Sequence, residues 1–183
     1  MRSKTILAFL GLVMVLQVRA QEGMYASSNG TIDFTSNAEL EVIRATSADV
    51  QGLLNPATNS FAFQVNINSF NGFNSDLQRQ HFYENYMEGD KFARASFNGK
   101  IIESIDFSQP GTYEVRAKGE LEIHGLKQVR IIRGTLTVRP NQVSIESTFT
   151  VPLSDHNIRI PRIVNQKIAT EIDVTFRSTL QLP

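Results

Sequence analysis

Residues 112–124 read TYEVRAKGELEIH, and apolar and polar side chains alternate through the whole stretch. One face would carry Tyr113, Val115, Ala117, Gly119, Leu121 and Ile123. A period of two over thirteen residues predicts a β-strand. At ~3.3 Å per residue this strand would be roughly 43 Å long, so it either bends sharply or belongs to a tall, curved sheet. Gly119 lies at its middle on the apolar face, where a missing side chain permits a tight bend.

The same alternation recurs along the chain. It predicts long strands at 61–67, 143–153 and 168–180, and shorter ones at 31–36, 38–45, 95–105 and 129–138. Turn signals occur at Asn29-Gly30, Asn98-Gly99, Gln109-Pro110-Gly111 and Pro140-Asn141. Short connections between consecutive strands imply an antiparallel meander. The apolar faces of these strands all need cover, and the chain has no helix for each of them, which favours a closed barrel over a flat sheet. We therefore expect an all-β fold, an up-and-down antiparallel β-barrel of about eight strands.

One helix is expected to interrupt the meander. Ser75 followed by Gln78 fits a capping box, and the helix would run to Glu88 and stop at Gly89. Its inward stripe would consist of Leu77, Phe82, Tyr86 and Met87. Such a helix would cover one mouth or one side of the barrel. Residues 46–54 are a candidate for a second, shorter turn of helix before Asn55-Pro56.

Residues 1–20 are organised like a secretory signal peptide. Basic residues precede an uninterrupted run of eleven apolar or small residues, Ile6–Leu16, and small Val18 and Ala20 precede the expected cleavage before Gln21. Eleven residues are too few to span a bilayer as a helix, which needs roughly 20. An uncleaved anchor is the alternative. We expect an exported domain of residues 21–183 that has no stable membrane anchor.

The composition excludes several classes of function. The chain has 183 residues, which suits one domain, and its 18 Lys+Arg balance 18 Asp+Glu. Removal of the signal takes Arg2, Lys4 and Arg19 and leaves a mildly acidic domain, so we expect no nucleic-acid partner. The chain has no Cys, which excludes disulfides, thiolate metal sites and thiol catalysis.

Three stretches are informative together. The first runs from Ser69 to Phe97 and contains HFYENYMEG at 81–89; the second is GELEIHG at 119–125; the third is LSDHNI at 153–158, followed by the strand near 168–176. In order and spacing they resemble the YceI-like family of secreted bacterial proteins. The resemblance covers most of the chain, roughly residues 30–178.

This resemblance implies a lipocalin-like barrel with a long apolar tunnel. In some members the tunnel holds a polyisoprenoid chain, such as an isoprenoid quinone. The resemblance also implies a periplasmic location after secretion across the inner membrane. Some members are dimeric, so a homodimer is left open here.

A small barrel either fills its interior with side chains or holds one ligand. Small or polar residues on the inward faces favour a cavity over a filled interior: Ala117, Gly119, Ser147, Thr170 and Ser178. The residues expected to line the lumen are Phe63, Val65, Ile67, Phe82, Tyr86, Tyr113, Val115, Leu121, Ile123, Phe149, Val151, Ile172, Val174 and Phe176. Phe61 shares the inward parity of Phe63.

The three histidines have separate interpretations. His81 and His124 occupy motif positions and are candidates for contacts with a ligand head group; alternatively, His81 packs at the barrel mouth and His124 caps a turn. His156 is expected to be a solvated loop residue. No two histidines have the i, i+2 or i, i+4 spacing that would place them on one face of one element, so we expect no metal. No cofactor is expected apart from a bound polyisoprenoid.

The leading hypothesis is an exported protein that stores or transports an isoprenoid lipid. One alternative is an enzyme acting on a hydrophobic substrate, with His81 and Glu84 as acid and base. The chain has no His-Glu-x-x-His and no Gly-x-Ser-x-Gly motif, so we expect a protein that is not an enzyme. The other alternative is a structural or interaction module with a filled barrel.

Overall fold

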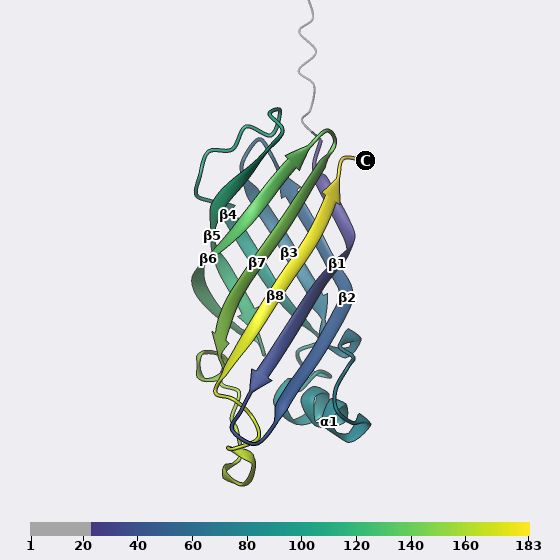
Figure 1. Ribbon diagram of the computed structural model, residues 1–183, viewed down its shortest axis with the longest axis vertical. Coiled ribbons are helices and arrows are strands. Elements are labelled where there is room, and N and C mark those ends of the chain that lie inside the picture. Colours follow the sequence, from purple (N-terminus) through teal and green to yellow (C-terminus); the bar gives the residue numbers. More distant parts are fainter. Residues whose placement is uncertain (1–22) are drawn as a thin grey trace, which may run out of the picture.

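The computed structural model describes residues 23–183, so the predicted signal peptide and its cleavage site lie outside the described residues. Eight antiparallel strands form one closed barrel in which every strand pairs with its neighbours in sequence, and β1 pairs with β8 (Figure 1). The strands are β1 (Tyr25–Asn37), β2 (Val42–Asn55), β3 (Ser60–Asn66), β4 (Arg94–Ile101), β5 (Gly111–Ile123), β6 (Leu126–Arg139), β7 (Gln142–Pro152) and β8 (Glu171–Gln181). The predicted all-β, up-and-down barrel is confirmed.

The stretch at 112–124 forms most of β5, and its apolar face points into the barrel. β5 and β6 pair from Gly111↔Val138 to Ile123↔Leu126, which leaves His124 and Gly125 as a two-residue turn. Both turn residues have positive φ, at 51° and 72°. This is the backbone of a type I′ hairpin, whose twist matches that of the flanking strands.

Gly119 lies opposite Gly99 of β4. A Cβ at Gly119 would lie 2.3 Å from the carbonyl oxygen of Asn98, and one at Gly99 would lie 2.2 Å from that of Lys118. The two glycines therefore allow a close approach of β4 and β5. The turn predicted at Asn98-Gly99 is wrong, because this dipeptide lies inside β4.

Residues 46–54, the candidate for a second, shorter turn of helix, do not form one. They instead belong to strand β2. The pairing with β1 passes from Ser47↔Ile32 to Val50↔Gly30, so that strand β2 has one extra residue. At this β-bulge the buried positions of β2 change from odd to even residue numbers. A strict period of two therefore does not extend through the whole strand. Asn29-Gly30, predicted as a turn, lies at the same irregular part of β1.

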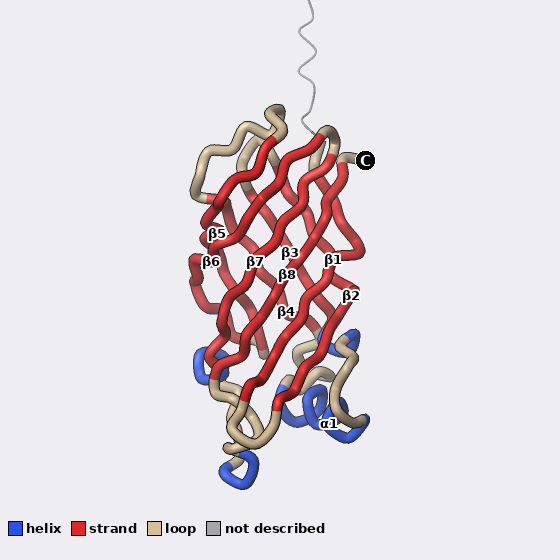
Figure 2. The backbone as a smooth tube through the Cα atoms, viewed as in Figure 1, coloured by secondary structure: helices blue, strands red, loops and turns tan. Residues whose placement is uncertain are grey.

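The helical segment lies between β3 and β4 and covers one end of the barrel (Figure 2). Ser75 caps α1 (Asp76–His81), since its side chain accepts from the backbone N–H of Gln78 at 3.2 Å. The predicted continuation to Glu88 is instead a π-helical turn, Phe82–Tyr86. Short 3-10 turns follow β3 (Ile67–Ser69) and β7 (Leu153–His156), and a third is Arg162–Val164.

Candidate functional site

Two cavities lie along the barrel axis. An inner cavity of about 150 Å³ lies among the strands, and a mouth cavity of about 450 Å³ lies at the end covered by α1. Both are lined by Ile32, Val65, Ala95, Ile123, Val151 and Val174. Because these six side chains belong to both linings, the two cavities adjoin each other along the barrel, and together they are called the tunnel. The mouth cavity alone is within the range of about 300–1,000 Å³ that is usual for ligand sites.

The tunnel is closed at the end opposite α1. Leu54 and Leu136 line its deep part and are completely buried. They belong to a packed cluster with Tyr25, Val143 and Leu180. The tunnel therefore has one apolar floor and one mouth, which suits a ligand with an apolar tail and a polar end.

Almost all of the predicted lumen residues line this tunnel. Phe63, Val115, Leu121, Phe149 and Phe176 line the inner cavity, Ile67, Phe82, Tyr86 and Ile172 line the mouth cavity, and Val65, Ile123, Val151 and Val174 line both. Tyr113 is the exception: it packs against the closed-end cluster, and its hydroxyl donates to the carbonyl oxygen of Gln109 at 3.1 Å. Phe61 also lines the inner cavity.

An aromatic cluster at the mouth was not predicted. Phe34 of β1 lies 5.3 Å from Phe82, 5.5 Å from Phe70 and 5.9 Å from Phe73, measured between ring centroids. Such pairs add to the stabilisation from burial. Phe34 shares the parity of Ile32, so alternation could have identified it. Phe70 and Phe73 follow no strand period, although both lie in the stretch from Ser69 to Phe97 that carries the family resemblance.

Polar side chains lie around the mouth. The mouth cavity is lined in part by Ser36, Glu41, Ser75, Gln78, His81 and Lys167. Gln78 donates to Glu41 at 2.9 Å and links α1 to the loop after β1. Burial raises the pKa of Tyr86 above its ordinary value of 10.0. His81 is therefore one of the polar groups at the rim of the tunnel.

Glu84 is not part of this lining. Its carboxylate accepts from the side-chain amide of Gln80 at 3.1 and 3.2 Å, one turn earlier. Neither cavity is lined by Glu84, whereas His81 lines the mouth. The two residues proposed as acid and base are therefore not brought together at the tunnel.

His124 lies outside both linings. Its imidazole is 9% exposed, with Nε2 2.6 Å from the carboxylate of Glu88 and Nδ1 3.1 Å from the carbonyl oxygen of His156. The ring of Phe92 packs edge-on against it, with centroids 4.7 Å apart. These contacts connect the β5–β6 turn to the end of the helical segment and to the chain after β7.

His156 is completely buried, so its prediction as a solvated loop residue is wrong. It lies in the 3-10 turn after β7, and its Nδ1 is 3.2 Å from the carbonyl oxygen of Leu126, to which it donates. Burial lowers the pKa of His156, and hydrogen bonds to the backbone at Leu126 and Ile123 oppose this effect. The GELEIHG and LSDHNI stretches are therefore in contact through His124 and His156. The hydrogen bonds of these two histidines are together called the clasp.

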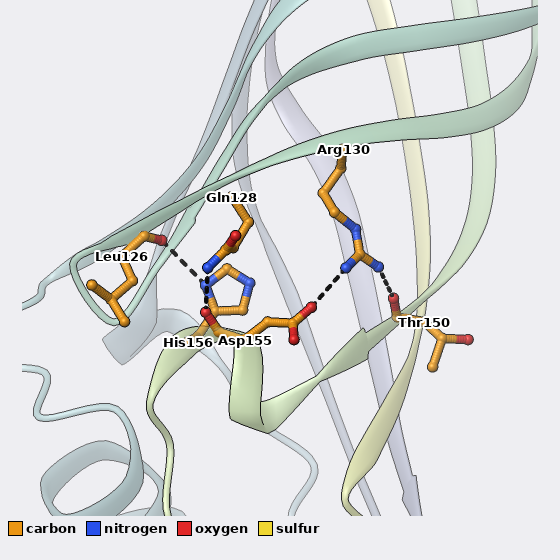
Figure 3. A network of polar contacts seen from close by, with 6 residues as sticks. All are labelled: Leu126, Gln128, Arg130, Thr150, Asp155 and His156. Carbon is orange, nitrogen blue, oxygen red and sulfur yellow. Dashed lines mark hydrogen bonds and ion pairs between the residues drawn. The ribbon is translucent and has the colours of Figure 1, made fainter.

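A seam separates β6 from β7 near this clasp. Their pairing runs only from Arg139↔Gln142 to Thr135↔Glu146, although both strands continue toward the α1 end. Side chains take the place of the missing ladder, as Figure 3 shows. Arg130 donates to Asp155 at 2.9 Å and to the carbonyl oxygen of Thr150 at 3.0 Å.

The inner cavity reaches this seam. Gly134 of β6 and Ser147 of β7 both line it, and the Ser147 hydroxyl donates to the carbonyl oxygen of Arg133 at 2.6 Å. Near the start of β6, Gln128 bridges the seam: its side-chain amide donates to the carbonyl oxygen of Asp155 at 2.7 Å (Figure 3). The barrel wall is therefore weakest in backbone pairing at a place where the tunnel lies directly behind it.

Residues 23–183 contain no group of three or more His, Asp or Glu side chains arranged to hold a metal ion. In the same range, no helix has the length and apolar character needed to cross a membrane.

Solved structures of several bacterial proteins share this fold. A polyisoprenoid-binding domain from Saccharophagus degradans, implicated in plant cell wall breakdown, has a TM-score of 0.74 at 13% identity, with 88% of this chain and 99% of that chain covered. BcnA of Burkholderia cenocepacia has a TM-score of 0.68 at 13% identity, covering 82% of this chain and 95% of its own. The YceI protein of Campylobacter jejuni has a TM-score of 0.60 at 12% identity, covering 76% and 84%.

At these identities the structural similarity shows a common fold. None of the curated proteins compared with the chain matches it. The family model described as the YceI-like domain matches residues 15–180, which include β1 to β7 and all of β8 except Gln181. The chain therefore belongs to the YceI-like family.

Proposed function

We propose that this protein is an exported carrier that holds one polyisoprenoid chain in its tunnel, for storage or transport. The observation that carries the proposal is the apolar tunnel, closed by Leu54 and Leu136 and open beside α1. The solved domain from Saccharophagus degradans, described as polyisoprenoid-binding, supports the ligand class. The predicted signal at 1–20 supports export to the periplasm.

Energetics favour a long ligand. Burial of apolar surface contributes about 0.8 kcal/mol per methylene, whereas association costs about 4–15 kcal/mol in lost freedom. About ten methylenes would therefore only offset the lower part of that cost. A chain of several isoprene units that fills both cavities gives a useful affinity, and a short acyl chain does not.

No catalytic step is part of the proposal, because retention requires only burial of the apolar tail and accommodation of the head group at the mouth. The direct test is native mass spectrometry of the purified protein, followed by organic extraction. A bound mass that the solvent removes and that is identified as a polyisoprenoid is the expected result.

The rim position of His81 gives a prediction about head groups. His81→Ala should weaken binding of an isoprenoid quinone by roughly 2- to 10-fold, because one hydrogen bond typically contributes about 0.5–1.5 kcal/mol. Binding of a headless polyisoprene hydrocarbon of similar length should not change. Fluorescence titration with both ligands measures the difference.

Gln80→Ala is the matched control, since Gln80 lies on the same helix, bonds to Glu84 and does not line the tunnel. Equal losses for the quinone and the hydrocarbon would show that His81 acts on the mouth generally and not on the head group.

His124→Ala is expected to lower thermal stability, because both ring nitrogens of His124 are engaged within the protein.

A further inference from the structure

The outer face of β4–β6 carries exposed apolar side chains beside the seam. Val129 and Ile131 of β6 are 68% and 57% exposed, and Ile102, just after β4, is 43% exposed. The strand register places Ile131 beside Lys118 and Lys118 beside Lys100, while Val129 lies beside Glu120. These apolar residues therefore form one patch on β4–β6, and Figure 1 labels these strands on its left side.

Cationic side chains flank this patch, and the carboxylate of Glu120, which lies beside Val129, pairs with Lys127 at 3.3 Å. Lys100, Lys118 and Arg133 are exposed and take part in none of the ion pairs found within residues 23–183. Arg116 lies beside Arg133 and pairs with Glu103 at 2.7 Å. The whole chain has a net charge of zero, so this local excess of cations is balanced by acidic residues elsewhere.

The face also has a shallow hollow. A cavity of about 380 Å³ lies above the Gly99–Gly119 pair and is lined by Lys100, Lys118 and Val129, among others. Gly99 and Gly119 belong to the same lining, so the backbone of β4 and β5 forms part of the floor. Exposed apolar side chains, cations and a depression thus occur together on the wall next to the seam.

We propose that this face docks on an anionic lipid surface. Val129, Ile131 and Ile102 would enter the boundary between head groups and acyl chains, and Lys100, Lys118 and Arg133 would contact anionic head groups. This combination of inserted apolar area and flanking cations is the usual basis of peripheral membrane binding. Docking here would turn the β6–β7 seam, behind which the tunnel lies, toward the bilayer.

Charge complementarity selects a lipid surface over a second copy of the chain. A two-fold interface uses the same patch on both subunits. Self-association through this patch would bring the unpaired cations of two copies into one contact region, and like charges oppose such contact. An anionic bilayer neutralises the same cations. Docking is a property of the outer face, so it does not require the tunnel to be occupied.

Vesicle flotation tests the proposal. The probes are vesicles of equal parts phosphatidylglycerol and phosphatidylcholine, and vesicles of phosphatidylcholine alone. The wild-type protein should float with the anionic vesicles, and binding should fall at high salt. Lys118→Gln and Arg133→Gln should each reduce binding about fivefold, and the double variant Val129→Ser with Ile131→Ser should reduce it at least as much.

Leu53→Ser is the matched control, because Leu53 is 45% exposed on the far strand β2, between Ala26 and Ala62. It should bind vesicles like the wild type. Thermal unfolding and lipid retention are measured for every variant, so that a loss of docking is distinguished from unfolding and from failure of the carrier function.

Three results would overturn the docking proposal: no flotation of the wild type, equal losses in the patch variants and in Leu53→Ser, or equal binding to neutral vesicles. A concentration-dependent dimer that Ile131→Ser abolishes, with no vesicle binding, would assign the patch to a second copy.

Discussion

Replacing Ala95 by Trp should abolish retention of a long isoprenoid without unfolding the barrel. Ala95 is the smallest of the six residues that line both cavities, and it therefore lies where the tunnel passes from its mouth to its inner part. An indole at this point would separate the two cavities. A ligand could then occupy only the mouth.

The size of the effect follows from the length of chain excluded. Keeping one five-carbon isoprene unit out of the inner cavity removes about 4 kcal/mol of burial, at about 0.8 kcal/mol per carbon. Affinity for a long isoprenoid quinone should therefore fall roughly a thousandfold. A quinone with one isoprene unit, which needs only the mouth, should bind the variant and the wild type equally weakly. Titration with a series of chain lengths measures both.

Ala62→Trp provides the control, since Ala62 lies on β3 with the opposite parity and outside both linings. Overpacking of the tunnel by Ala95→Trp should cost about 1–3 kcal/mol of stability, which thermal unfolding will show. Undiminished retention of a long chain by a folded Ala95→Trp variant would contradict a ligand path through the junction.

His156→Ala should lower the free energy of unfolding by about 3–5 kcal/mol. The side chain is completely buried, so its removal leaves a cavity, and the carbonyl oxygen of Leu126 loses its donor. The 3-10 turn after β7 would then detach from the β5–β6 hairpin. A decrease of roughly 6–20 °C in Tm follows from such a loss in a domain of this size.

The pH dependence of stability gives a second measurement on the same residue. Burial lowers the pKa of His156 from its ordinary value of 6.5, so the unfolded chain takes up a proton at a higher pH than the native one. The neutral, buried His156 therefore leaves the native protein at its full stability above pH 6.5. Stability decreases as the pH falls from there through the lower native pKa, because the unfolded chain binds the proton more readily. Chemical unfolding at pH 7.5 and at pH 5.5 should therefore show a larger loss for the wild type than for His156→Gln.

His81→Ala is the matched histidine control, because His81 is exposed at the mouth. It should change Tm by less than about 2 °C, as surface substitutions usually do. A His156→Ala variant as stable as His81→Ala would mean that the clasp does not hold the end of the barrel.

Alternation predicted the barrel wherever the strands are regular. In β5, β7 and β8 the inward residues all have the same parity along the whole strand. They could therefore be identified directly from the sequence. β2 could not be read in the same way, because the bulge between Ser47 and Val50 changes its parity. A bulge depends on the partner strand, and a single sequence does not contain that information.

The candidate site shows the same division. The strand residues of the tunnel follow the period of two, whereas Phe70 and Phe73 reach the mouth from an irregular connection. His156 was predicted to be solvated because it lies between polar neighbours in sequence. Its burial results from contact with Leu126 across the turn, which is a tertiary effect.

The central claim is that the tunnel holds a polyisoprenoid, and native mass spectrometry tests it most directly. The protein is purified without detergent, and its mass is recorded before and after organic extraction, with Ala95→Trp prepared in parallel. We predict an extractable polyisoprenoid in the wild type that the variant lacks, and rebinding of an added long-chain isoprenoid quinone by the extracted wild type alone. A wild-type protein that retains no lipid and binds no added isoprenoid quinone would contradict the account.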